Sequence, residues 1–171
     1  MGLPHITSFC WCMGLEAGAK LIGYVHFVIS VSLMVLCSMF AEKARALIGT
    51  VEDAEDGLYS TWYSIAVGVA VGSVVHVLLA ATLIVSVYKR WAWGARAWAW
   101  VMCALYVAAL GYVCVAAMLY GFNASGSDIF LSFLEGLLFF GILAYCILCV
   151  NSYYLMLRSA EDMQGPGKTY Y

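Results

Sequence analysis

Four long apolar runs constrain the fold of this chain more than any other feature of its sequence. They cover residues 21–40, 61–88, 97–122 and 129–157. A helix needs about 20 residues to cross the roughly 30 Å hydrocarbon layer of a bilayer, and each run is long enough. The prolines, Pro4 and Pro166, both lie outside the runs, so no run contains this helix breaker. The sequence therefore predicts an all-α fold, an integral membrane bundle of four transmembrane helices forming a single domain over residues 1–171.

The charged residues support this fold class and predict its orientation. They make up only 11% of the chain, whereas a soluble domain carries about 25%. Cytoplasmic loops are enriched in lysine and arginine, which favours an arrangement with both termini in the cytoplasm (N-in/C-in). That arrangement puts six basic residues inside and two outside: Lys20, Lys89, Arg90, Arg96, Arg158 and Lys168 against Lys43 and Arg45.

The second run carries a strip of small residues that ends in a histidine. Ser64, Gly68, Gly72 and His76 are spaced four residues apart, which places them on one side of a helix. Small side chains at this spacing let a second membrane helix approach closely and gain van der Waals contact. We therefore predict a helix-packing surface here, which faces either another helix of this chain or another protein.

Three ionisable residues lie at membrane depth: His26, His76 and Glu135. Such residues are candidates for functional sites in membrane proteins. Counting 1.5 Å per residue puts His76 near the bilayer centre, His26 about 6 Å nearer the cytoplasm and Glu135 about 12 Å nearer the outside. These separations are too wide for direct proton transfer. Histidines hydrogen-bonded between helices are one interpretation, and a proton or ion conductor that uses His76 and Glu135 is the alternative.

Catalytic motifs are missing from the sequence. It has no HExxH, no nucleophile elbow and no phosphate-binding glycine loop, so we expect no enzyme activity and no cofactor. Cys10 and Cys12 are too closely spaced for a zinc ribbon, and we expect no metal. The turn at residues 89–100 alternates tryptophan with arginine, a pattern that indicates the membrane interface rather than nucleic-acid binding.

The tails and the second outer loop carry signals for modification and docking. Cys10 and Cys12 lie in the predicted cytoplasmic tail beside the first run, where cysteines are candidates for reversible palmitoylation. Asn123 begins a glycosylation sequon on the predicted outer side. The C-terminus, which ends in Tyr171, resembles peptides that PDZ-type domains capture.

The start of the first run, Cys10-Trp-Cys12-Met-Gly-Leu-Glu-Ala-Gly18-Ala-Lys-Leu-Ile-Gly23, resembles the cysteine-containing start of the lysosome-associated protein transmembrane (LAPTM) family and of its insect tetraspan relatives, the Pasiflora-like proteins. The four-run order and the two short tails extend the resemblance over the chain. It implies a tetraspan protein of endosomes, lysosomes or the plasma membrane and, for the Pasiflora-like branch, a role in septate junctions. LAPTM proteins often carry proline-tyrosine motifs that recruit ubiquitin ligases, and this tail has none.

Together these observations predict a non-enzymatic tetraspan protein. We expect it to act as an interaction scaffold or trafficking component, at junctions of the plasma membrane or in endosomes and lysosomes. The expected partners are other integral membrane proteins or a second copy of the chain, the lipid bilayer, and a PDZ-type domain at the C-terminus, with no nucleic acid.

Overall fold

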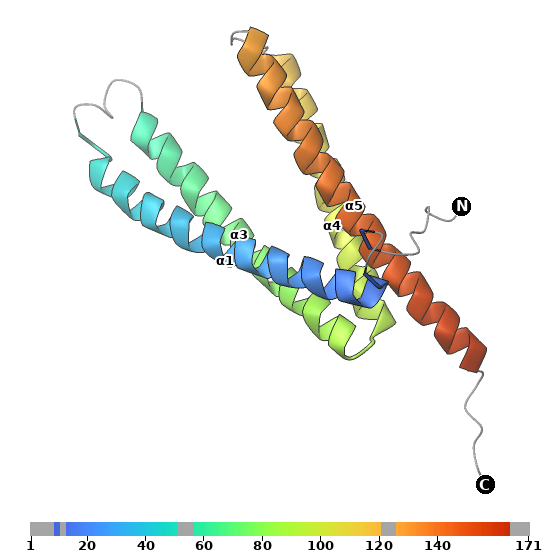
Figure 1. Ribbon diagram of the computed structural model, residues 1–171. Helices are drawn as coiled ribbons and strands as arrows, with labels where there is room; N and C mark the ends of the chain where they lie inside the picture. Colours follow the sequence, from blue (N-terminus) through green and yellow to red (C-terminus); the bar gives the residue numbers. More distant parts are fainter. Residues whose placement is uncertain (1–8, 11–12, 51–56, 121–125, 165–171) are drawn as a thin grey trace. The chain divides into compact units, whose positions relative to one another are not determined.

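The computed structural model describes residues 9–10, 13–50, 57–120 and 126–164, without the side chains of residues 116, 119–120, 126–128, 161–162 and 164 (Figure 1). Three predictions concern positions outside the described residues. These are the palmitoylation of Cys12, the glycosylation of Asn123 and the capture of the C-terminal Tyr171.

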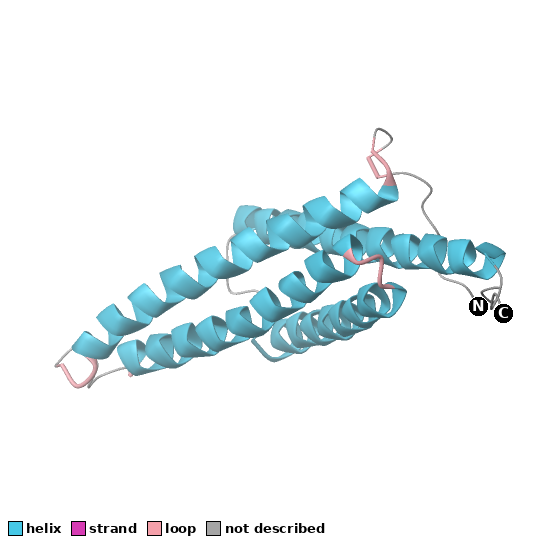
Figure 2. Ribbon diagram, turned by 90° about the horizontal axis from the view of Figure 1, so that it is seen from below, coloured by secondary structure: helices cyan, strands magenta, loops and turns pink. Residues whose placement is uncertain are grey.

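Four long helices make up the described fold. They are α1 (Leu15–Leu47), α3 (Leu58–Tyr88), α4 (Ala92–Tyr120) and α5 (Gly126–Gln164). Among the described residues, Figure 2 shows helices and loops, and an isolated bridge joins Phe9 and Met13. Each apolar run, as far as it is described, falls within one helix. The predicted all-α fold is therefore confirmed.

All four helices are long and apolar enough to cross a membrane. At most 17% of the most apolar stretch of any helix is buried within the protein, and large side chains such as Tyr112 and Phe133 are 75% and 68% exposed. Apolar surface on this scale is typical of a protein whose solvent is lipid. The chain therefore has the helices of an integral membrane protein. The orientation of the tails and the single domain remain predictions.

The four helices belong to two compact units. One unit comprises residues 20–85 and holds most of α1 and α3. The other comprises residues 1–19 and 86–171 and holds α4 and α5.

In the unit of residues 20–85, α1 and α3 form an antiparallel hairpin (Figure 1). At the end near the α1–α3 connection, the rings of Phe40 and Trp62 meet edge to face, with 6.2 Å between their centroids. Toward the other end, Ile84 packs so closely on Gly23 that a Cβ there would come within 2.8 Å of the Ile84 Cγ1. Glycine is thus required at position 23 by the approach of the two helices.

Small residues line both helices of this hairpin at intervals of seven residues. A seven-residue interval keeps a row on nearly the same side of a helix, and small side chains let two membrane helices approach. On each helix the row is buried, with only Cys37 half-buried: Gly23, Ser30, Cys37 and Ala44 on α1, and Ala66, Ser73 and Ala80 on α3. The hairpin therefore packs through small residues other than the predicted strip.

The other unit is built on the antiparallel pair of α4 and α5 (Figure 2). Its fully buried side chains come from both helices and from the end of α3, and include Val87, Trp98, Met102, Val150 and Tyr153. Burying large apolar and aromatic side chains gains dispersion contacts that hold in lipid as well as in water. These residues form the core of this unit.

The turn from α3 to α4 belongs to the same unit and is tightly specified. Arg90 adopts a left-handed backbone conformation with φ +50°. Its N–H donates to the Val87 carbonyl at 3.2 Å, and the Trp91 N–H donates to the Ser86 carbonyl at 2.8 Å. This pattern is a Schellman motif, which satisfies the last carbonyl groups of a helix. It ends α3, and α4 begins directly after it at Ala92.

Candidate functional site

The most unusual feature of the α1–α3 hairpin is a pair of histidines that face each other at membrane depth. The His26 and His76 rings lie 5.9 Å apart between centroids, with their planes tilted by 38°. Both side chains are half-buried. Counting heights along the chain predicted an axial offset of about 6 Å, too wide for direct proton transfer. The antiparallel register instead brings the two side chains together across the helix interface.

Two buried serines extend this polar pair. Ser30 lies one turn after His26 on α1, and Ser73 lies about one turn before His76 on α3. Each serine is 5% exposed, and the Ser73 hydroxyl donates to the Val69 carbonyl of its own helix at 2.8 Å. Polar groups are costly inside a membrane unless they are hydrogen-bonded. The histidines and serines therefore form a polar cluster within an apolar hairpin.

The chemistry available to this polar cluster is proton binding. A neutral imidazole has one donor and one acceptor nitrogen, so two neighbouring rings can share hydrogen bonds or hold one extra proton. Two charged rings at this distance would repel each other. The described residues include no group of three or more His, Cys, Asp or Glu side chains that could hold a metal ion.

The predicted strip on α3 does not act as one surface within the hairpin. A Cβ at Gly68 or Gly72 would meet nothing within 4 Å, and the Ser64 hydroxyl donates to the Ser60 carbonyl of its own helix at 3.0 Å. Four residues turn a helix by about 40° more than one full turn, so a four-residue row winds around the helix. At the end of the strip, His76 faces α1, whereas the glycines lie on open surface of the hairpin.

Glu135 lies on α5, in the unit of residues 1–19 and 86–171, and its side chain is exposed. The structure therefore places the three ionisable residues in two different settings. His26 and His76 belong to the polar cluster, whereas Glu135 lies outside it.

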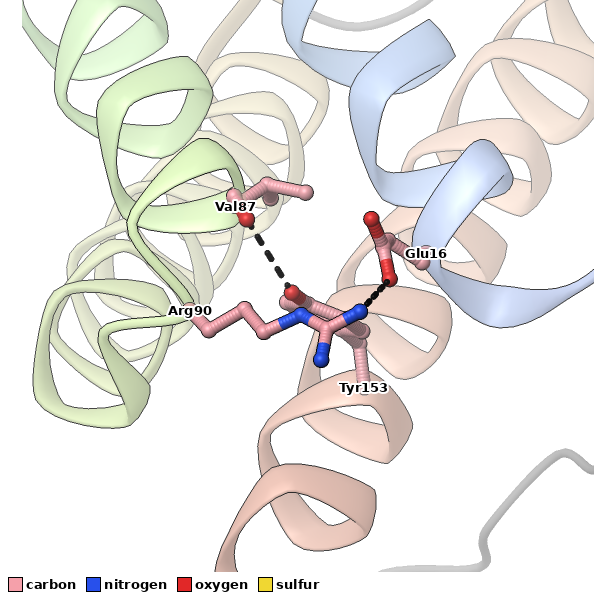
Figure 3. A network of polar contacts seen from close by, with 4 residues as sticks. All are labelled: Glu16, Val87, Arg90 and Tyr153. Carbon is pink, nitrogen blue, oxygen red and sulfur yellow. Dashed lines mark hydrogen bonds and ion pairs between the residues drawn. The ribbon is translucent and has the colours of Figure 1, made fainter.

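A polar contact network that the sequence did not predict lies in the same unit as Glu135. The Arg90 guanidinium forms an ion pair with Glu16, at 3.4 Å between Nη2 and Oε2, and the Tyr153 hydroxyl donates to the Val87 carbonyl at 3.4 Å (Figure 3). The Arg90 side chain is 72% exposed and that of Glu16 is 36% exposed. Exposed pairs of this kind contribute little to stability. The network therefore serves mainly to place the start of α1 beside the α3–α4 turn.

A basic cluster lies where α4 begins and α5 approaches its end. The Arg96 and Arg158 guanidinium groups both donate to the hydroxyl oxygen of Tyr154, at 3.2 and 3.0 Å. Arg96 also lies over the Trp93 ring, 5.3 Å from its centroid. The sequence identifies these arginines as charges that set the orientation, and Arg96 also as part of the tryptophan–arginine pattern of residues 89–100. Their convergence depends on the pairing of α4 with α5, for which one sequence carries no direct signal.

The described part of the N-terminal segment holds Cys10 against α5. The Phe9 and Met13 backbones exchange hydrogen bonds of 2.9 and 3.0 Å. The Cys10 N–H donates to the Tyr145 hydroxyl oxygen at 2.9 Å. Cys10 is exposed and its thiol is free. This placement is compatible with the predicted acylation, which remains a prediction.

An apolar groove lies between α4 and α5, farther along the pair from the basic cluster. Its volume is about 770 Å³. Residues of both helices line it, including Tyr106, Val113, Phe133, Gly136 and Phe140. A lipid chain would match such a lining, as it matches the rest of the exposed helix surface.

Comparison of the chain with protein-family models, with curated proteins and with solved structures found no match. The resemblance to the LAPTM family and to Pasiflora-like proteins therefore remains a prediction from the residues that carry it.

Proposed function

We propose that this protein is a non-enzymatic tetraspan membrane protein that assembles with other integral membrane proteins, or with a second copy of itself, through the small-residue face of α3. The observation that carries the proposal is the open position of Gly68 and Gly72. Within the hairpin, α1 packs against α3 on a different row of small residues, so the glycines remain available.

The physical argument concerns the force that associates helices in lipid. Because lipid tails are as apolar as leucine, burying apolar surface contributes little there, and close backbone approach gives most of the gain. Glycine in the middle of a helix costs about 0.5–1 kcal/mol relative to alanine. Two glycines one turn apart, each with open space where a Cβ would lie, are best explained by a second helix that packs over them.

The cellular role that fits this proposal is a junction or trafficking component. The resemblance to LAPTM and Pasiflora-like proteins favours either lateral junctions of the plasma membrane or endosomes and lysosomes. Acylation of Cys10 would add a membrane anchor beside α1, and a mass-shift assay for thioester-linked acyl chains on wild type and on Cys10→Ser tests it directly.

The experiment that tests the assembly compares the variant Gly68→Leu/Gly72→Leu with wild type in cells. We expect co-purification of membrane partners, or of a differently tagged copy of the chain, to fall at least about tenfold, because two leucines separate the helices and remove close contacts. Gly111→Leu is the control, since a Cβ at Gly111 also meets nothing within 4 Å, but the residues four positions before and after it, Val107 and Val115, are not small. Unchanged assembly and location of the double variant would count against the proposal.

A second function is favoured by the contact between His26 and His76. The protein would then conduct protons or ions. The paired histidines would be its proton-binding groups in the hairpin, and the Glu135 carboxylate would be a third ionisable group. In liposomes that contain the purified protein, this function predicts a pH-dependent flux that His26→Gln or His76→Gln abolishes. Wild-type protein without flux would exclude it and leave the histidines as a hydrogen-bonded contact between helices.

A further inference from the structure

The basic cluster of Arg96 and Arg158 has the geometry of an anion site. Both guanidinium groups donate to the same oxygen, at 3.2 and 3.0 Å, so the two donor nitrogens lie within about 6 Å of each other. Tyr154, which accepts both bonds, is only 7% exposed, whereas Arg158 is exposed and Arg96 is half-buried. Like charges brought this close repel each other. An anion beside them would relieve the repulsion.

The hydrogen-bond donors that remain on Arg96 and Tyr154 also favour an anion site. A guanidinium has five N–H donors in a fixed planar arrangement, and Arg96 uses one of them in its bond to Tyr154. The Tyr154 oxygen accepts from both arginines, and no acceptor for its own proton appears among the described residues. Within that part of the chain, no carboxylate pairs with Arg96. Donors of three side chains therefore converge without an anionic acceptor for Arg96.

Two aromatic rings contact the Arg96 guanidinium. Its Cζ lies 5.3 Å from the Trp93 centroid and 5.5 Å from the Tyr154 centroid. Cation–π contacts of this kind attract the guanidinium to the ring faces. A fixed donor arrangement favours planar, bidentate contact with an oxyanion such as phosphate.

The place of the cluster on the helices selects the source of the anion. The apolar span of α4 begins at Ala92 and that of α5 ends at Ala160. Arg96 and Arg158 lie within about 6 Å of these ends along the helix axes. Lipid phosphates lie at this level, just outside the hydrocarbon, and long arginine side chains extend toward them.

We propose that Arg96, Arg158 and Tyr154 bind the phosphate of an anionic lipid headgroup, with a preference for a phosphomonoester such as phosphatidic acid. A phosphomonoester carries up to two negative charges and three terminal oxygens, which match two guanidinium groups and one hydroxyl. A phosphodiester headgroup such as that of phosphatidylserine has only one charge on its phosphate and two terminal oxygens.

The test uses the purified full-length protein in phosphatidylcholine nanodiscs that contain a small fraction of phosphatidic acid, and native mass spectrometry counts the lipids that stay bound. We expect retention of phosphatidic acid to fall at least about tenfold in Arg96→Gln/Arg158→Gln, because charge-assisted hydrogen bonds are lost. Tyr154→Phe, which keeps the ring, should lower retention about threefold. Lys43→Gln/Arg45→Gln also removes two exposed positive charges, in the other unit, and is the matched control.

Further arms identify the ligand and keep the result interpretable. Phosphatidylserine at the same fraction should be retained more weakly than phosphatidic acid. If inorganic phosphate displaces phosphatidic acid at equal concentration, free phosphate is the ligand and the lipid assignment is overturned. If Arg96→Gln/Arg158→Gln does not fold, Arg96→Lys/Arg158→Lys keeps the charges but loses the planar donors, and retention equal to wild type would overturn the site. If Lys43→Gln/Arg45→Gln lowers retention as much as Arg96→Gln/Arg158→Gln does, net charge alone attracts the lipid and the site is overturned.

Discussion

Gly94, near the start of α4, is the position where one added methyl group should lower the free energy of unfolding most. In Gly94→Ala the new Cβ would collide with the Ser86 hydroxyl oxygen and lie 2.7 Å from the nearest carbon of the Trp91 ring. Ser86 is fully buried, and Trp91 is held by the 2.8 Å bond from its N–H to the Ser86 carbonyl. Because Ser86 is fully buried, its hydroxyl has little space into which it can move.

The expected magnitude follows from two opposing effects. Alanine is more favourable than glycine inside a helix by at most about 1 kcal/mol. Overpacking a closely packed site costs about 1–3 kcal/mol. Because the contacts here are too short for any side-chain carbon, we expect overpacking to dominate, with a net loss of about 1–2 kcal/mol in the free energy of unfolding.

The assay is SDS titration of the protein in mixed micelles, followed by circular dichroism. Gly68→Ala is the control, since its Cβ meets nothing within 4 Å, and it should leave the stability unchanged or slightly raised. Ser86→Ala combined with Gly94→Ala removes the colliding hydroxyl and should recover at least half of the loss. The reasoning is refuted if Gly94→Ala is as stable as Gly68→Ala, or if the second substitution recovers nothing.

Three further predictions concern the polar contacts and the hairpin. Tyr153→Phe loses a buried but long hydrogen bond to the Val87 carbonyl and should lower stability by about 0.5–1 kcal/mol in the same titration. A loss above about 2 kcal/mol would mean that the hydroxyl stabilises the protein by more than this one hydrogen bond. Glu16→Gln breaks an exposed ion pair with Arg90 and should change the free energy of unfolding by less than about 0.5 kcal/mol, at low salt as well as at high salt. Gly23→Leu should force α1 away from α3 and cost about 2 kcal/mol or more, and a stability equal to that of wild type would show that the two helices are farther apart than described.

The sequence was sufficient to predict the four helices, because a run of about 20 apolar residues without proline has few alternatives in a membrane. It placed their ends less well. α1 begins at Leu15 rather than near residue 21, and α5 continues to Gln164. A helix does not have to stop where the hydrocarbon does, so polar residues such as Glu16 and Arg158 extend it. Hydrophobicity alone does not locate such ends.

The candidate sites could be predicted only in part, because they depend on how the helices pair. His26 and His76 were identified as ionisable residues at membrane depth, but their contact follows from the antiparallel register of α1 and α3. The strip at Gly68 and Gly72 was recognised from its four-residue spacing. The row that α1 contacts has a seven-residue spacing instead, which stays on one side of a helix for longer. The seven-residue spacing of small residues is the signal in the sequence that indicates this row.

The most direct test of the proposed assembly surface is a photo-crosslinking amino acid placed at position 68 of the full-length protein in cell membranes. The same amino acid at position 66 is the comparison, because Ala66 is buried and belongs to the row on which the hairpin packs. We predict that position 68 forms adducts with a transmembrane helix of another protein or of a second copy of the chain, identified by mass spectrometry. Position 66 should yield products within the chain. If position 68 also yields only products within the chain, the face is used internally and the proposed assembly is contradicted.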